Sequence, residues 1–358
     1  MKRVHNFSAG PAALPLEVLE KAQQELVDYR GSGTSIMEMS HRGAHYTEVD
    51  QQARERLTRI LGLGDDFEIM FLQGGASTQF MMVPYNLLGA GKKADYINTG
   101  AWSKKSITEA KRFGDINIPF TSEDSNFNRV PTQSELSLSS DAEYVHFTTN
   151  NTIFGTQFRS ELEANGVPLV GDMSSDFLSR PVDVQKYGII YAGAQKNLGP
   201  AGVTVVIVRK DMFEKMNTDI PTILSYNTHA GKLFNTPPSF PVYMVNLVLE
   251  WVENKGGLSF FETFNQQKAD LLYDEIDADD FYNGTAERAS RSLMNVTFRL
   301  PSEDLEATFL KEAATKDLLA LKGHRSVGGI RASIYNACPM ESVEALVAFM
   351  KEFRNANG

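Results

Sequence analysis

The sequence predicts an α/β protein built on a mostly parallel sheet flanked by helices, with a smaller C-terminal α+β domain. Short apolar strands alternate with helices along most of the chain, which is typical of doubly wound sheets whose two faces are both covered. Gly256-Gly257 interrupts that alternation, and a helix, strands and further helices follow it. We therefore place a large domain at 16–258 and a small domain at 1–15 and 259–358.

Hydrophobic periodicity predicts the elements of the large domain. Apolar residues at helical spacing predict a helix that ends at Phe113 and others over Leu16–Tyr29, Glu48–Leu61, Phe80–Leu88 and Tyr243–Lys255. Short apolar runs predict strands over Phe67–Leu72, Lys93–Asn98, Asp115–Pro119, Glu143–Thr148, Val167–Asp172, Gly188–Ala192 and Val203–Val208. The prolines of the loop Asn227–Pro241 indicate extended, exposed chain, suited to an arm or a subunit contact.

The small domain is predicted from the remaining segments. A strand covers Met294–Leu300, and Leu321–Ile334 supplies further strand. Helices are expected over Ser259–Ile276, Ser302–Thr315 and Met340–Phe353. The last of them places its apolar residues on one side, so it should pack against the small sheet.

Composition excludes several classes of protein. A chain of 358 residues with 42% hydrophobic and 22% charged residues is typical of a globular protein with a substantial core. The net charge of −10 argues against a broad nucleic-acid surface. The N-terminus lacks an apolar signal core, and no stretch approaches the roughly 18 to 20 apolar residues of a membrane span. With Cys338 as a single, buried cysteine, we expect a cytoplasmic protein without disulfide, metal or membrane contact.

A confined lysine is the first candidate for chemistry. Lys196 follows the strand Gly188–Ala192, has small neighbours and precedes the turn Gly199–Gly202. Small residues let a flat ligand approach the backbone, and glycines permit a tight turn. Partial desolvation would lower the pKa of this lysine and free its amine for Schiff-base chemistry. An ordinary surface lysine in a loop is the alternative.

Two further candidates follow predicted strands. Asp172 ends an almost wholly apolar strand, where a carboxylate is costly unless a positive group meets it. A role as helix N-cap is the alternative. Trp102 follows Lys93–Asn98, at the strand edge where α/β sheets bind ligands, and could stack on a flat ring. Most tryptophans, by contrast, are packing residues.

The connection Gly74-Gly75-Ala76-Ser77 lies between a predicted strand and a predicted helix. Backbone N–H groups at such a helix start can bind phosphate. A plain helix start with a hydroxyl cap explains the same residues equally well. The sequence contains neither GxGxxG after its first strand nor GxxxxGK[ST], so dinucleotide and P-loop sites lose their main support.

Two clusters of basic residues stand out in this acidic chain. His41-Arg42 lies between two predicted helices, and His324, Arg325 and Arg331 lie in or next to a glycine-rich loop. Either cluster could be solvated loop charge. Three basic side chains in a glycine-rich turn nevertheless suit a doubly charged anion, to which arginine offers bidentate contacts.

Together these motifs are similar to those of the phosphoserine aminotransferase family, pyridoxal-phosphate enzymes of aminotransferase class V with the aspartate-aminotransferase fold (PLP-transferase fold type I). The match extends over nearly the whole chain, in the family's order. The matching stretches are Asn6–Pro11, Ser40–Gly43, Gly171–Ser175, Tyr191–Gly202, Phe234–Pro238, Gly323–Arg331 and Ala332–Ala337. Their co-occurrence is far more specific than any single motif.

The resemblance implies a role for each candidate. Lys196 corresponds to the lysine that binds pyridoxal 5'-phosphate, Asp172 to the carboxylate facing the ring nitrogen, and Trp102 to the aromatic residue stacked on the ring. Other cofactor contacts correspond to Ala76, Ser77, Thr152 and Gln195, although some members carry Arg in place of Ser77. Substrate contacts correspond to Ser8, His41, Arg42, His324, Arg325 and Arg331, the last for the α-carboxylate.

The resemblance also implies a homodimer in which Asn235 and Thr236 contact the partner's cofactor. The implied reaction moves the amino group of L-glutamate to 3-phosphohydroxypyruvate, giving O-phospho-L-serine and 2-oxoglutarate, and 4-phosphohydroxy-L-threonine is a further expected product. The alternatives are an alanine–glyoxylate transaminase, a cysteine desulfurase, for which Cys338 in a structural strand is poorly suited, and a cofactor-binding protein without turnover.

Overall fold

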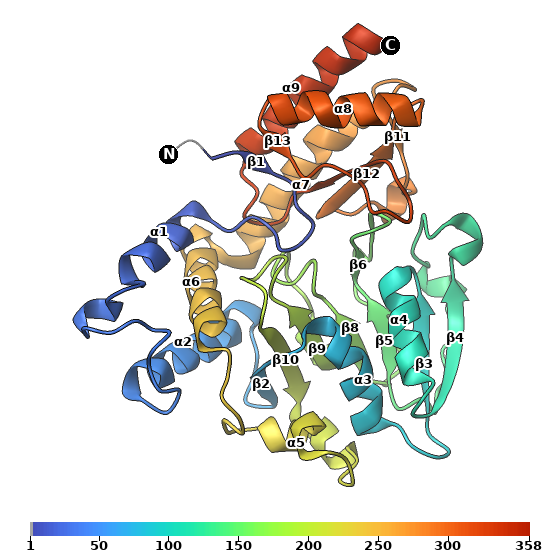
Figure 1. Cartoon of the computed structure of the whole chain (residues 1–358). Helices are drawn as coiled ribbons and strands as arrows, with labels where there is room; N and C mark the ends of the chain where they lie inside the picture. Colours follow the sequence, from blue (N-terminus) through green and yellow to red (C-terminus); the bar gives the residue numbers. More distant parts are fainter. Residues whose placement is uncertain (1–2) are drawn as a thin grey trace.

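A seven-stranded sheet forms the centre of the protein (Figure 1), whose computed structural model describes residues 3–358. In spatial order its strands are β2 (Phe67–Leu72), β10 (Thr204–Arg209), β9 (Tyr187–Gly193), β8 (Leu169–Asp172), β5 (Val145–Thr148), β3 (Lys93–Asn98) and β4 (Asp115–Thr121). Among them β10 runs antiparallel to both neighbours, and the other pairings are parallel. The predicted fold class is confirmed.

Both faces of the central strands are buried, which explains why β8, β9 and β10 are apolar at nearly every position, whereas the edge strand β4 is largely exposed. Successive side chains of β9 alternate between two clusters: Ile190 and Ala192 belong to one, Ile189 and Tyr191 to the other. The first face is covered by α1 (Leu16–Glu25), α2 (Ala44–Leu61) and α6 (Ser239–Lys255), and the second by α3 (Gly75–Leu87) and α4 (Ala101–Ala110). Fully burying one large apolar side chain stabilises the fold by about 2 kcal/mol.

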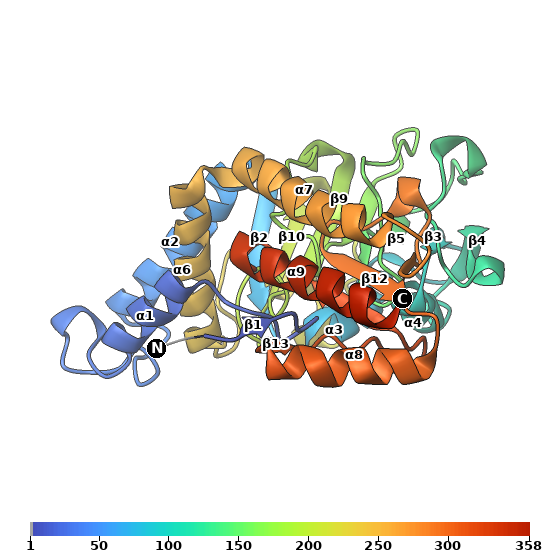
Figure 2. The same ribbon diagram turned by 90° about the horizontal axis from the view of Figure 1, so that it is seen from above.

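A second, smaller sheet lies beside one end of the large one. Its antiparallel strands are β11 (Asn283–Gly284), β12 (Asn295–Arg299) and β14 (Ile330–Ser333). Helices α7 (Gly257–Ile276), α8 (Glu303–Thr315) and α9 (Met340–Asn357) pack with it, and Figure 2 shows α7 beside α9. Ser302 caps α8 by accepting a hydrogen bond from the Leu305 amide, as the predicted start of that helix implies.

The N-terminal segment joins this smaller region. Strand β1 (His5–Asn6) pairs in parallel with β13 (Leu318–Leu319), and Phe7 is buried in the same hydrophobic cluster as β12 and α9. Helix α7 contributes Phe261 to the large core and Leu272 to the small one. The proposed division at 258 therefore stays a prediction, and its range 1–15 begins outside the described residues.

Several predicted boundaries were wrong. Helix α1 ends at Glu25 instead of Tyr29, because the Asp28 carboxylate accepts a hydrogen bond from the Gly33 amide and closes a turn, leaving Val27 81% exposed. Helix α3 begins at Gly75, well before Phe80, and Trp102 lies in the first turn of α4. The predicted proline-rich loop is shorter, since α5 (Tyr226–His229) and the start of α6 lie within it.

Two short strands, β6 (Asn150–Asn151) and β7 (Thr156–Gln157), form a hairpin after β5. No helix in the range 3–358 combines the length and the apolar character needed to cross a membrane.

Candidate active site

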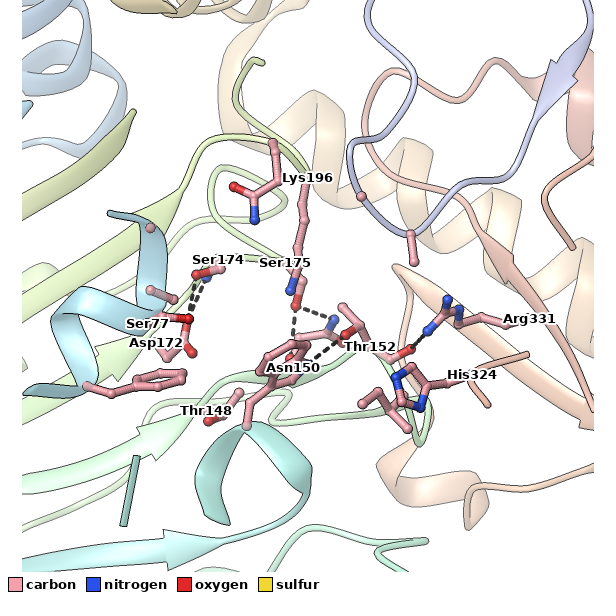
Figure 3. Close-up of a pocket in the computed structure, with 18 of the residues that line it drawn as sticks. Ser77, Thr148, Asn150, Thr152, Asp172, Ser174, Ser175, Lys196, His324 and Arg331 are labelled. Atoms are coloured by element: carbon pink, nitrogen blue, oxygen red, sulfur yellow. Dashed lines mark hydrogen bonds between the residues drawn. The ribbon is translucent and has the colours of Figure 1, made fainter. Parts of the chain in front are cut away.

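A cavity of about 420 Å³ opens at the carboxyl edge of the large sheet. The connections that follow β2, β3, β5, β8 and β9 all line it, because parallel strands end at the same edge. Figure 3 shows Asp172 at one end, His324 with Arg331 at the other, and Lys196 projecting between them. The predicted residues that line the cavity are Ala76, Ser77, Trp102, Thr152, Asp172, Gln195, Lys196, His324 and Arg331.

The other predicted residues do not line this cavity within one chain; they are Ser8, His41, Arg42, Asn235, Thr236 and Arg325. The side-chain amide of Asn235 donates to Oε1 of Gln73 at 3.2 Å, and the Thr236 carbonyl accepts from Nε2 of Gln73 at 3.0 Å. Gln73 immediately precedes the glycine turn of the cavity. The loop with Asn235 and Thr236 thus reaches the rim of its own chain's site, and its role toward a partner stays a prediction.

Lys196 is held in place by hydrogen bonds on both sides of it. The Ala12 amide donates to the Gln195 carbonyl at 2.9 Å, and Nδ2 of Asn197 donates to the Phe177 carbonyl at 2.6 Å. A Cβ on Gly10 would lie 3.3 Å from Cγ of Lys196, so the N-terminal segment packs closely against the lysine stem. Burial lowers the pKa of the Lys196 amine; Asp172 opposes this shift and Arg331 adds to it.

Asp172 ends β8 in a buried position, with one carboxylate oxygen anchored. Its Oδ1 accepts from the Ser174 amide at 3.1 Å and from Ser174 Oγ at 2.7 Å. Oγ of Ser174 in turn accepts from the Gly193 amide at 3.1 Å, which ties β8 to the end of β9. Burial raises the pKa of Asp172, against the charge of Lys196 and the Ser174 hydrogen bonds. Within residues 3–358 no hydrogen bond goes to Oδ2, which is left for a ligand.

Trp102, Thr152 and Arg331 form a connected wall between the two ends. Nε1 of Trp102 donates to Oγ1 of Thr152 at 3.0 Å, and Nη1 of Arg331 donates to the Thr152 carbonyl at 3.1 Å. Nζ of Lys196 lies 5.4 Å from the centre of the Trp102 ring. The hydroxyl of Thr152 therefore orients the indole, and its carbonyl orients the guanidinium.

Arg331 is a cation of the cavity that has no acidic partner among residues 3–358. It lies on β14, and burial lowers the pKa of its guanidinium. Its Nε is buried without a hydrogen-bond partner, and among residues 3–358 its side chain pairs with the Thr152 carbonyl and with no carboxylate. A buried cation that lacks an anion is costly, so this group is suited to receive a carboxylate from a ligand.

The glycine turn after β2 presents free backbone N–H groups. Gly74 and Gly75 have φ of 94° and 64°, and a Cβ on Gly74 would lie 1.9 Å from Oγ1 of Thr78. Only glycine fits at position 74. No side chain caps α3, so the N–H groups at its start remain available to a phosphate.

Sequence reasoning assigned no role to several residues that line the cavity: Ala9, Gly10, Phe80, Thr148, Asn150, Ile153, Ser174 and Ser175. Asn150 donates from Nδ2 to Oγ of Ser175 and to Oδ1 of Asn295, both at 2.8 Å, and so links the two sheets beneath the site. Thr148, Asn150, Ile153, Ser174 and Ser175 lie at or shortly after the ends of β5 and β8, which was the available signal for them. Ala9, Gly10 and Phe80 carried no such signal.

These groups fit pyridoxal 5'-phosphate. The start of α3 suits its phosphate, the free oxygen of Asp172 suits its ring nitrogen, and the Lys196 amine suits its aldehyde carbon. The cavity also has room for a small amino acid beside the ring, toward Arg331.

Comparisons with known proteins agree with this geometry. The family model for class-V aminotransferases matches residues 4–346. A phosphoserine aminotransferase of Desulfosudis oleivorans is 57% identical over 361 residues, covering 100% of this chain and 99% of the relative. The solved phosphoserine aminotransferase of Bacillus circulans subsp. alkalophilus superposes with a TM-score of 0.98 at 53% identity, covering 100% of both chains.

A PLP-bound phosphoserine aminotransferase from Trichomonas vaginalis superposes with a TM-score of 0.91 at 42% identity, covering 98% of this chain and 100% of its own. Similarity at this level over the full length extends to both the sheet and the small C-terminal region. The chain therefore belongs to the class-V aminotransferase family.

Proposed function

We propose that this protein is a pyridoxal-phosphate-dependent transaminase that moves the amino group of L-glutamate to 3-phosphohydroxypyruvate, giving O-phospho-L-serine and 2-oxoglutarate. The observation that carries the proposal is the meeting of Lys196, Asp172 and Arg331 in one cavity. Relatives that are 51–57% identical over their full length bear the name phosphoserine aminotransferase.

The bound cofactor supplies an electron sink for the carbanion formed at the substrate's Cα. Asp172 would hold the proton on the ring nitrogen, which would keep that sink effective. Lys196 would take the proton from Cα as a base and return it as an acid to the cofactor's former aldehyde carbon, on the other side of the transferred nitrogen. The lowered pKa of Lys196 favours the neutral amine that the first step requires.

The remaining residues orient the reactants. Arg331 binds the α-carboxylate of each substrate in turn, and Trp102 stacks on the cofactor ring. His324 lies at the far end of the cavity, next to Arg331, where the distal anionic group of the substrate would be (Figure 3). Ser8, His41, Arg42 and Arg325 are proposed to complete the substrate site.

A cysteine desulfurase is not supported. Cys338 is buried in the small region and does not line the cavity, and burial raises the pKa of its thiol to about 11. A desulfurase needs an accessible thiolate. The resemblance to an alanine–glyoxylate aminotransferase from Nostoc, at 14% identity and a TM-score of 0.78, shows the shared fold alone.

We further propose a cytoplasmic homodimer in which Asn235 and Thr236 contact the partner's cofactor. Phe234, which precedes them, is 44% exposed, and an exposed aromatic in a loop that contains prolines suits a subunit contact. Mixing inactive Lys196→Ala protein with an inactive Asn235→Ala plus Thr236→Ala variant should restore partial activity through hybrid dimers. Lack of recovery would restrict both residues to contacts within their own chain.

A coupled assay tests the reaction. Purified protein with pyridoxal phosphate should form 2-oxoglutarate from glutamate only when 3-phosphohydroxypyruvate is present, and unphosphorylated keto acids should react poorly. A protein that binds the cofactor, as seen from a visible absorbance band, but gives no product with this pair would refute the proposed substrates.

A further inference from the structure

Lys105 lies next to the site, although it belongs to none of the motifs described above. It follows Trp102 by three residues on α4, so both side chains lie on the same face of the helix. Its Nζ is 4.4 Å from the centre of the Trp102 ring, within the range of a cation–π contact. Two ammonium groups, those of Lys105 and Lys196, thus lie close to one indole.

The charge of Lys105 is not neutralised by the protein. No carboxylate pairs with it within residues 3–358, whereas Nζ of the neighbouring Lys104 lies 2.5 Å from Glu123. Both lysines are exposed. The difference between them is that Lys104 has an acidic partner on the surface and Lys105 lies over the aromatic wall of the cavity.

Lys105 also acts on the basic end of the cavity. Burial lowers the pKa of the His324 imidazole, and the positive charges of Arg331, Arg325 and Lys105 lower it further. Four cationic or ionisable groups from α4, the glycine-rich loop and β14 therefore share one region. Like charges gathered without an acid are unfavourable unless an anion joins them.

We propose that Lys105 is a further specificity residue, whose ammonium group binds the distal phosphate of the substrate from the Trp102 side of the cavity. This inference rests on the proposed function. A lysine is a compact charge on a flexible stem, so it can meet a phosphate beyond the reach of the fixed Arg331. A phosphate dianion gains more from it than the single negative charge on the side-chain carboxylate of glutamate.

A purely structural role predicts a different outcome. If Lys105 only braced Trp102, its loss would weaken the use of both substrates alike and would lower the affinity for the cofactor. A residue that binds phosphate instead raises the KM for the phosphorylated substrate while kcat and the cofactor's visible absorbance band remain unchanged.

The test compares Lys105→Gln with the matched Lys104→Gln variant in the holoenzyme. Lys105→Gln should raise the KM for 3-phosphohydroxypyruvate about tenfold, as expected for the loss of one charge-assisted contact. The KM for glutamate should change by less than about threefold, in keeping with the weaker attraction of a single exposed charge. Lys105→Arg should restore most of the loss, and Lys104→Gln should match the wild type.

Calorimetric binding of 3-phosphoglycerate, which has neither an amino nor a keto group, gives a readout independent of turnover. Its affinity should fall in Lys105→Gln, and the affinity for glutarate should not. Equal values for Lys105→Gln and Lys104→Gln, or an equal loss for both ligands, would overturn the inference. Wild-type protein that does not transaminate 3-phosphohydroxypyruvate would instead refute the proposed function.

Discussion

The two ends of the cavity are built differently. At the Asp172 end, the reactive groups follow strands of the large sheet, and hydrogen bonds from Ser174 and around Lys196 hold them. At the His324 end, the charged groups come from the small region, His324 lies on a loop with left-handed Gly328 and Gly329, and its Nδ1 pairs only with nearby Ser326. Hydrogen bonds within the fold thus fix the groups that we propose for the chemistry. The cations that we propose to bind the substrate's negative charges have no acidic partner among residues 3–358.

Lys268 provides a useful contrast with those unpaired cations. It is a buried cation on α7, and its Nζ donates to the carbonyls of Ile334, Tyr335 and Cys338 at 2.7–3.1 Å. All three of its protons are used within the protein, so it has no capacity left for a ligand. Complete satisfaction of its protons is typical of a structural cation, whereas Arg331 has an unpaired Nε and also no carboxylate partner among residues 3–358, which supports its proposed binding role.

The largest effect is expected from Lys196→Ala. Without this amine the proton at Cα has no acceptor, so kcat should fall by about 10⁴-fold or more. Absorbance spectra should show that the visible band, which borohydride abolishes in the wild type, is already missing in the variant. Circular dichroism should be unchanged, because Asn197 and Ala12 still hold the turn. Activity within tenfold of the wild type would exclude Lys196 from proton transfer.

Asp172→Asn should separate activity from stability. Its kcat should fall by about 10²- to 10⁴-fold, because the amide cannot hold the ring-nitrogen proton in the way a carboxylate does. Oδ1 of the new amide can still accept from Ser174, so the geometry should survive.

The pH dependence of the same variant follows from the raised pKa of Asp172. The folded state holds this proton more tightly than the unfolded chain, so the resulting stability is present at low pH and is lost as the pH rises through the raised pKa. The free energy of unfolding of cofactor-free protein, measured with denaturant, should fall between pH 5 and pH 8. This fall should be smaller in Asp172→Asn than in the wild type. Equal losses would indicate that the carboxylate is not penalised by burial.

Arg331→Gln should act on substrate binding. Loss of a buried charge-assisted contact should lower kcat/KM by about 100-fold for both glutamate and the phosphorylated keto acid. Arg331→Lys should lower kcat/KM by less than Arg331→Gln does, since lysine keeps the positive charge but cannot make the bidentate contact of a guanidinium. The affinity for the cofactor should not change in either variant; a loss of bound cofactor would place Arg331 in the cofactor site instead.

Lys268→Met should have the smallest effect on catalysis and a clear effect on folding. Three buried carbonyls lose their donor, so the free energy of unfolding should fall by about 3 kcal/mol, with KM for both substrates unchanged. Thermal unfolding and steady-state kinetics of the same preparation provide both measurements. If KM rose and the free energy of unfolding did not change, Lys268 would be a binding cation and not a structural one.

Local sequence patterns predicted most elements and failed at boundaries. The strands Phe67–Leu72 and Lys93–Asn98 were predicted without error because each is a short run with an apolar centre, bounded by turn residues. The end of α1 was missed because the apolar Leu26 and Val27 continue a helical pattern, although both are exposed. The early start of α3 was missed because its first turn is made of small residues.

The sequence by itself predicted the fold class and the family correctly, and it proposed the residues that carry the chemistry, because strand periodicity and short motifs are local properties of the chain. Only the tertiary structure decided which charges are satisfied. In the sequence alone, Lys268 lies in a predicted helix and Arg331 next to a glycine-rich loop, but neither position shows whether the charge is paired within the protein. The carbonyls that accept from Lys268 lie 66 to 70 residues further along the chain. Lys105 and His324, whose charges influence each other, are likewise far apart in the sequence.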